Sequence, residues 1–337
     1  MTRSKAPSLI FIYLRAALSA LTKKRTLGSD VSHFPKLPEE TLEFAIDHRH
    51  VQQFIKAVSR ESEILHDAQP SFSEANIAVP ITYLQCRLNS LPMNMVTHPQ
   101  FPIDIIGSVH ESSKIVSYRP LFVSIKDNAQ TNKPLYHASC RLEPKIRRSD
   151  KNDLLVTVVT SIYRPLYDGN DTPDESIPED TIMDITNEYR VLNPNRHKVN
   201  VDRSSSGDPT PIDYFDENLW EALATWDFPV DTGRKYAALN GDINPIHMFP
   251  ITAKIFGYKS CIAHGMYNVC KLANESRIVN ARSGVGTITA RFTRPTLLPN
   301  DNVMAFLNKH TDDYVIGVQN NDGEFKETVV GTIRFDG

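Results

Sequence analysis

Residues 236–266 of this chain read YAALNGDINPIHMFPITAKIFGYKSCIAHGM, and no other stretch of the 337 residues concentrates as many side chains suited to chemistry. The stretch opens with an apolar helical turn. That turn ends at Asn240 and Gly241, a pair that tolerates the left-handed backbone angles common at helix C-termini. A polar turn follows, and a His-Gly-Met block closes the stretch. The pattern predicts two helical segments joined by a rigid turn that carries the reactive groups.

The polar turn places a carboxylate and an imidazole five residues apart, at Asp242 and His247. Asp242 and Asn244 can accept hydrogen bonds from backbone N–H groups, and Pro245 stiffens the turn. A carboxylate and an imidazole held in this way can converge on one water molecule without touching each other, which suits general acid/base catalysis. A purely structural interpretation stays open, in which the polar residues only cap the turn and His247 is an ordinary histidine at a helix start.

This stretch resembles the signature of the MaoC-like hydratases and dehydratases, a family that includes the R-specific enoyl-CoA hydratases. The resemblance covers about residues 215–336 and rests on these segments: Tyr236–His247, Ala253, Phe256–Tyr258, Ala263–Met266, Arg291–Pro295 and Leu298-Pro299. It departs at Asn240, where the family more often has a small hydroxyl residue. The departure concerns the positioning of the turn more than its chemistry.

The resemblance implies an α+β fold, the hot-dog fold, in which a curved antiparallel sheet wraps around a central helix. It also implies the reversible hydration of a 2-enoyl thioester to a (3R)-3-hydroxyacyl thioester. Asp242 and His247 would hold and deprotonate the water, while the backbone N–H of Gly265, at the start of the central helix, would receive the negative charge of the thioester oxygen. The residues expected around the substrate are Tyr236, Asn244, His264 and Met266, although Asn244 also holds the turn and His264 also suits a packing role.

The implied substrate carries its acyl group on coenzyme A or on an acyl carrier protein, and no cofactor and no metal ion are expected. Two other functions stay open: a non-catalytic hot-dog protein that binds acyl thioesters, and a thioesterase, which shares the fold. The presence of both Asp242 and His247 in their full context favours an enzyme over a binding protein. The motif itself favours hydration over thioester cleavage.

Length and composition favour two domains or one large double unit, because 40% of the 337 residues are hydrophobic and 23% are charged. A net charge of −3 gives no reason to expect nucleic acid as a partner. Four cysteines show no CxxC spacing and indicate reduced thiols in a cytoplasmic protein: Cys86, Cys140, Cys261 and Cys270.

An internal repeat indicates that the N-terminal half is a second copy of the same unit. Pro80–Leu88 can be laid over His264–Leu272 so that Tyr, Cys and Leu coincide. Phe54 and Tyr236 are separated by nearly as many residues as Pro80 and His264. The entry helix and the central helix are therefore similarly spaced in both halves. The N-terminal copy has neither the Asp-x-Asn-Pro turn nor the His-Gly pair, so we expect a degenerate, catalytically silent unit.

The two expected units span residues 36–166 and 214–337, and we predict that they pack together as a pseudo-dimer, with a homodimer of the whole chain as a further option. In the N-terminal unit the hydrophobic pattern predicts a strand at 42–46, a helix from about 51 to 58, and strands at 114–125, 134–142 and 153–163. In the C-terminal unit it predicts a strand at 219–228, helices at 230–239 and 263–278, and strands at 284–294, 302–309, 314–319 and 326–335.

Two segments outside these units have unusual composition. Residues 167–213 are acidic, proline-bearing and serine-rich, which predicts a linker that lets the second unit fold back on the first. Residues 1–35 combine basic side chains with an apolar run at 8–21. That run is too short to span a membrane and lacks a good cleavage site, so we predict an amphipathic helix that either packs on the protein or rests on a membrane surface.

Overall fold

The computed structural model describes residues 37–59, 76–101, 108–124, 135–143, 147–148, 153–164, 181–191, 213–275, 278, 285–320 and 322–335. The predicted basic segment at 1–35, including the run at 8–21, lies outside these residues, as does most of the predicted linker. Among the described residues, no helix is both long enough and apolar enough to cross a bilayer.

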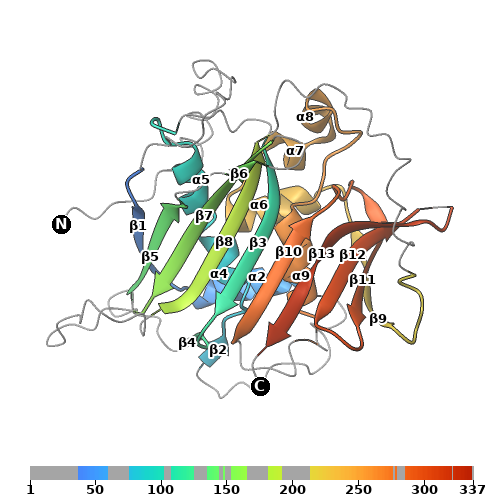
Figure 1. The fold of residues 1–337 in the computed structure, drawn as a ribbon, viewed down its shortest axis with the longest axis horizontal. Coiled ribbons are helices and arrows are strands. Elements are labelled where there is room, and N and C mark those ends of the chain that lie inside the picture. Colours follow the sequence, from blue (N-terminus) through green and yellow to red (C-terminus); the bar gives the residue numbers. More distant parts are fainter. Residues whose placement is uncertain are drawn as a thin grey trace, which may run out of the picture.

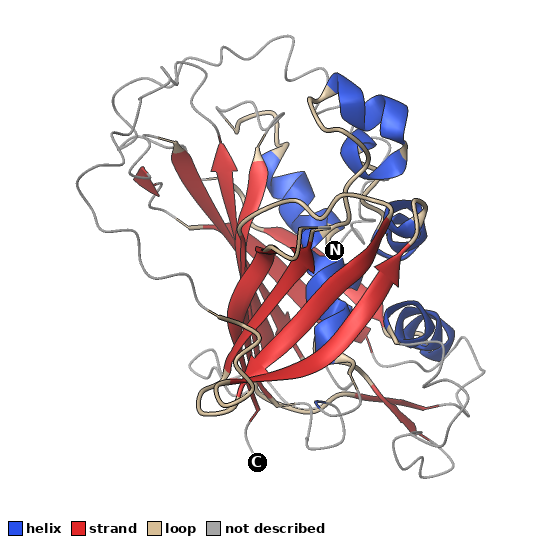
Figure 2. Ribbon diagram, turned by 90° about the vertical axis from the view of Figure 1, so that its right-hand side faces the viewer, coloured by secondary structure: helices blue, strands red, loops and turns tan. Residues whose placement is uncertain are grey.

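One antiparallel sheet of 11 strands dominates the fold and carries helices on one side (Figures 1 and 2). The N-terminal half contributes, in sheet order, β1 (Glu40–Ala45), β5 (Leu135–Leu142), β7 (Leu154–Tyr163), β8 (Thr181–Val191) and β3 (Val109–Ser117). The C-terminal half continues with β10 (Gly286–Phe292), β13 (Phe325–Phe335), β12 (Asp313–Gln319), β11 (Asn300–Asn308) and β9 (Trp220–Phe228). The short β6 (Arg147–Arg148) pairs with β7, and β2 (Asn76–Ala78) pairs with β4 (Phe122–Ser124) in a separate small sheet.

The two halves have the same strand order, as a duplicated unit requires. When the short β2, β4 and β6 are set aside, the strands of each half lie in the order first, third, fourth, fifth, second. The second strands, β3 and β10, meet at the centre of the sheet as an antiparallel pair in which Ile115 lies opposite Ile288. Backbone hydrogen bonds therefore join the halves into a pseudo-dimer within one chain, and neither second strand is left as an open edge.

The first helix of each half follows its first strand, as predicted. α2 (His48–Val58) begins after Asp47, whose side chain accepts a hydrogen bond from the N–H of Arg49, and it buries an apolar stripe in the core. α6 (Thr232–Asn240) is the equivalent helix of the C-terminal half.

A pair of aromatic rings supports the alignment of the two halves. The rings of Phe54 and Tyr83 lie 5.6 Å apart in the N-terminal half, and those of Tyr236 and Tyr267 lie 5.4 Å apart in the C-terminal half. These are the residues that the sequence repeat places opposite each other.

The central helices differ from the sequence prediction. α9 (Gly265–Ala273) ends before the predicted limit of 278, at Asn274, which caps it by donating its side-chain amide to the carbonyl of Cys270. In the N-terminal half the equivalent helix is broken into α4 (Tyr83–Arg87) and α5 (Ser90–Val96). Pro92 explains this break, because a proline cannot donate the hydrogen bond that would continue a helix through Leu88.

Two strand predictions need correction. The predicted linker at 167–213 contains β8, an 11-residue strand in which nearly every second side chain is buried. The predicted strand at 114–125 starts earlier, at Val109, and is split into β3 and β4 at a turn that contains Pro120. Proline supplies no N–H to a sheet, so strands commonly end beside it.

Candidate active site

The reactive turn begins where α6 ends at a glycine in the left-handed conformation. Gly241 has a φ of 71° and donates its N–H to the carbonyl of Ala237 at 2.8 Å. The side-chain oxygen of Asn240 accepts a hydrogen bond from the N–H of Asp242 at 2.8 Å. Asn240 therefore holds the backbone of Asp242.

Two further side chains organise the turn through local hydrogen bonds. The Oδ1 atom of Asp242 accepts from the N–H of Asn244 at 3.1 Å. Asn244 in turn caps α7 (Pro245–Met248) by accepting from the N–H of Ile246 at 3.4 Å. Pro245 fits the first position of α7, where no N–H donor is needed. The predicted turn between two helical segments is thus confirmed, and His247 lies within α7.

His247 is a buried base with a defined proton position. Its Nδ1 lies 2.9 Å from the carbonyl oxygen of Ile262, and because a carbonyl can only accept, Nδ1 carries the proton. The Nε2 atom of the neutral ring is then free to accept one. Burial lowers the pKa of His247 below its usual value, while the charge of Asp242 and the bond to Ile262 oppose that shift. His247 is therefore neutral at pH 7.

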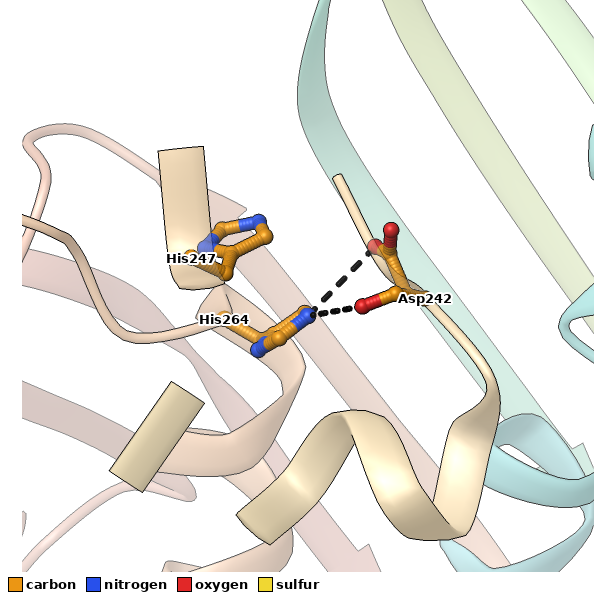
Figure 3. A group of neighbouring side chains, drawn as sticks. All are labelled: Asp242, His247 and His264. Carbon is orange, nitrogen blue, oxygen red and sulfur yellow. Dashed lines mark hydrogen bonds and ion pairs between the residues drawn. The ribbon is translucent and has the colours of Figure 1, made fainter. Parts of the chain in front are cut away.

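His264 contacts both of the other side chains, and the three form a triangle (Figure 3). Its ring stacks on that of His247 with 3.7 Å between the centroids. Its Nε2 lies 3.2 Å from the backbone oxygen of Asp242 and 3.6 Å from a carboxylate oxygen of the same residue. Burial and the neighbouring His247 lower the pKa of His264 to about 3, so this ring is also neutral. Sequence reasoning allowed His264 a packing role, whereas the structure makes it the contact that links the histidine to the carboxylate.

Gly265 starts α9 directly after His264, as predicted, with its N–H in the unpaired first turn of the helix. An aromatic ring occupies the space beside it, since a Cβ on Gly265 would lie 2.5 Å from the Cδ1 atom of Phe292. Glycine at this position therefore allows the ring to approach the backbone closely.

Tyr236 and Met266, both predicted to contact substrate, are buried in the core. The hydroxyl of Tyr236 lies 3.5 Å from the sulfur of Cys270 and so points away from the reactive turn. Its ring contacts that of His264, with 5.2 Å between the centroids. In contrast, 21% of the Asp242 side chain is exposed, which marks the side on which the turn meets solvent.

Asp242, His247 and His264 are the described residues best placed to bind a cation. Each offers one ligand atom, and these atoms all lie within 4.8 Å of one another. One ring nitrogen of His247 bonds to the carbonyl oxygen of Ile262, and one of His264 bonds to that of Asp242. Each ring therefore has only one other nitrogen to offer, and the same geometry also suits a water molecule in place of a cation. The absence of a metal remains a prediction.

Comparison with known proteins identifies the family. The MaoC like domain matches residues 219–329. A 3-hydroxyacyl-thioester dehydratase X of Mycobacterium tuberculosis is 30% identical over 223 residues, which are 66% of this chain and 67% of that protein. The chain belongs to the MaoC-like family.

Two solved structures have the same fold as this chain. The crystal structure of HtdX of Mycobacterium tuberculosis matches 89% of this chain and 100% of its own, with a TM-score of 0.61 and 22% identity. The full-length peroxisomal multifunctional enzyme type 2 of Drosophila melanogaster matches 88% of this chain and 48% of its own, with a TM-score of 0.57 and 12% identity. The predicted α+β hot-dog fold is confirmed.

Two residues beside the candidate site were not predicted as site residues from the sequence. Phe292 was assigned only to a strand, and His110 was not considered, although its ring lies 4.7 Å from that of Phe292. His110 belongs to β3 of the N-terminal half, outside the matched range of 219–329. No local motif marks it, and the pairing of β3 with β10 brings it next to Phe292.

Proposed function

We propose that this protein is a hydro-lyase that interconverts 2-enoyl thioesters and (3R)-3-hydroxyacyl thioesters. The observation that carries the proposal is the meeting of Asp242 with a neutral His247 on one turn, beside the first N–H groups of α9. The name of the Mycobacterium tuberculosis relative, a 3-hydroxyacyl-thioester dehydratase, supports the same class of reaction.

In the hydration direction, a water molecule between the Asp242 carboxylate and the Nε2 atom of His247 loses a proton to this pair. Its oxygen forms a bond to the β-carbon, and the electrons of the double bond move toward the thioester carbonyl. The resulting enolate oxygen accepts a hydrogen bond from the N–H of Gly265, where the helix dipole also favours negative charge. The proton then returns to the α-carbon. Dehydration follows the same steps in reverse.

The neutral state of His247 is what this reaction needs from a base. A histidine protonated at pH 7 could not accept a proton from water, whereas burial keeps His247 ready to do so. The bond from Nδ1 to Ile262 prevents the ring from turning over. His264 supports both partners by stacking on one and contacting the other.

The acyl carrier, coenzyme A or an acyl carrier protein, belongs on the solvent side of the turn, where Asp242 is exposed. Residues 243–260 beside it include two exposed cationic side chains, Lys254 and Lys259, and no acidic residue. Both carriers are anionic, so this surface suits either. Substrate contacts are proposed for Asn244 and His264, with Tyr236 and Met266 supporting them from the core.

The test is a comparison of two readouts on crotonyl-CoA. Loss of the enoyl absorbance, with formation of the (3R)-hydroxy product, supports the proposal. Release of free thiol without loss of the double bond would instead identify a thioesterase, and binding without either change would identify an acyl-thioester-binding protein. Repeating the assay after treatment with a chelator tests the predicted absence of a metal, since turnover should not change.

A further inference from the structure

The N-terminal half places its own side chains near the reactive turn. Figure 3 shows β3, in pale teal, passing behind Asp242. Burial lowers the pKa of His110 on β3 to about 4, and the shift is opposed by hydrogen bonds to Asn187 and to the backbone of Ser112 and, to a smaller extent, by the charge of Asp242. Burial raises the pKa of Tyr189 on β8, and the charge of Asp242 contributes to the rise. Both side chains are therefore within electrostatic reach of the carboxylate.

A continuous row of rings runs from these strands to the start of α9. The rings of Tyr189 and His110 stack with 5.1 Å between their centroids. His110 in turn lies 4.7 Å from Phe292, and Phe292 covers Gly265. Because interiors are closely packed, the position of His110 limits where the Phe292 ring can lie.

Polar side chains of the N-terminal half hold His110 in place. Its Nε2 lies 3.1 Å from the side-chain oxygen of Asn187, which also accepts hydrogen bonds from Ser113 at 3.0 Å and Gln85 at 3.2 Å. Asn187 is 1% exposed, and its Nδ2 atom has no hydrogen-bond partner among the described residues. Burying such a polar group costs free energy that an apolar residue would avoid. Costs of this kind are expected beside functional sites, where orientation matters more than stability.

We propose that His110 is a positioning residue of the active site: oriented by Asn187, it holds the ring of Phe292 over Gly265 and so closes the wall opposite the Asp242–His247 turn. The half that lacks catalytic groups thus shapes the oxyanion site of the other half. A fixed apolar wall against the backbone of Gly265 would exclude water from this end of α9 and so strengthen the hydrogen bond from its N–H to the enolate oxygen. This inference rests on the proposed hydro-lyase function.

The test compares three variants by steady-state kinetics on crotonyl-CoA. His110→Ala removes the support of Phe292, and we expect kcat to fall about 10-fold or more, with KM within about 3-fold, because the oxyanion bond forms mainly in the transition state. His110→Phe keeps a ring against Phe292 but loses the bond to Asn187, so its kcat should lie between those of wild type and His110→Ala. The matched control is His137→Ala, because His137 also contacts an aromatic ring, Tyr163, in the same sheet but on β5. It should leave kcat unchanged.

If His110 only stabilised the fold, His110→Ala and His137→Ala would both be less stable than wild type, and their kcat values would not differ. If His110→Ala does not fold, Phe292→Leu tests the same wall from the other half and should give a similar loss of kcat. Wild-type kcat in either variant, or a His110→Phe variant as impaired as His110→Ala, would overturn the inference alone. A wild-type protein without turnover would overturn the proposed function and this inference with it.

Discussion

The two halves share a strand order, yet their first helices end in different ways. In the C-terminal half α6 ends at Gly241 in the left-handed conformation, and the chain turns back so that Asp242 and His247 meet. In the N-terminal half the equivalent residue is Ser59, which has an extended backbone with φ −79° and ψ 165°. The left-handed helix end that starts the reactive turn is therefore found in only one of the two equivalent helices, although both halves have the same strand order.

A second difference lies at the start of the central helix. The repeat places Ile81 of the N-terminal half opposite Gly265. Ile81 is buried, whereas the absence of a side chain at Gly265 leaves its backbone next to the ring of Phe292. One half has an apolar side chain at this place, and the other has none, so that the ring of Phe292 lies against the backbone.

The largest expected effect comes from removing the groups that only the C-terminal half has. Asp242→Asn and His247→Gln should each lower kcat on crotonyl-CoA by about 10²- to 10⁴-fold, the usual contribution of a general acid or base. Circular dichroism and the melting temperature should stay close to wild type, because both replacements preserve size. Near-normal turnover in either variant would show that the two halves do not differ in the way proposed.

The next effect comes from making the C-terminal half resemble its partner at the central helix. Gly265→Ala should lower both kcat and stability, since the added Cβ would lie 2.5 Å from Phe292. Overpacking of this kind costs about 1–3 kcal/mol of unfolding free energy, measurable by urea denaturation. Adding Phe292→Leu should recover part of that stability. Additive losses in the double variant would mean that the ring is not what Gly265 accommodates.

Acid should destabilise the protein through its buried histidines. The folded-state pKa of His264 is about 3, below the ordinary 6.5, so the unfolded chain binds protons first as the pH falls. The contribution of His264 is fully present above pH 6.5 and is lost progressively below it, at about 1.4 kcal/mol per pH unit. Urea unfolding at pH 7, 6 and 5 should show a loss of stability that is larger from pH 6 to 5 than from pH 7 to 6. The pKa values of His110 and His247 are also lowered, so both add to the loss, and His264→Gln should reduce it without removing it. An unchanged slope in that variant would contradict the buried neutral state.

The smallest effect should come from the helix end itself. Gly241→Ser introduces the residue found at the equivalent position 59 and should cost about 1 kcal/mol, because the left-handed conformation strains a residue with a Cβ. Turnover should also fall several-fold as Asp242 shifts. Gly323→Ser is the matched control, since Gly323 has a φ of 80° and open space beside it. It should cost similar stability and leave turnover unchanged; equal turnover in the two variants would mean that the cap does not position Asp242.

Much of the fold could be predicted from the sequence because its signals are local. Alternating apolar residues predicted most strands of both halves, and the repeat predicted their pairing as two copies. β8 was missed although its burial alternates, because acidic and proline-bearing neighbours on both sides favoured a linker. The break in the central helix of the N-terminal half was not predicted, because Pro92 lies beyond the repeated segment Pro80–Leu88, yet removes the bond to the carbonyl of Leu88.

The sequence by itself determined the reactive turn, because Asn240, Asp242 and Asn244 each bond to a backbone N–H two residues away. Such contacts need no distant partner, so a motif can encode them. Only the tertiary structure decided that His264 stacks on His247 of a separate helix, and that His110 of the N-terminal half reaches Phe292 of the C-terminal half. Those contacts depend on how strands pair and helices pack, and the energy that selects them is spread over the whole core rather than written in any one segment.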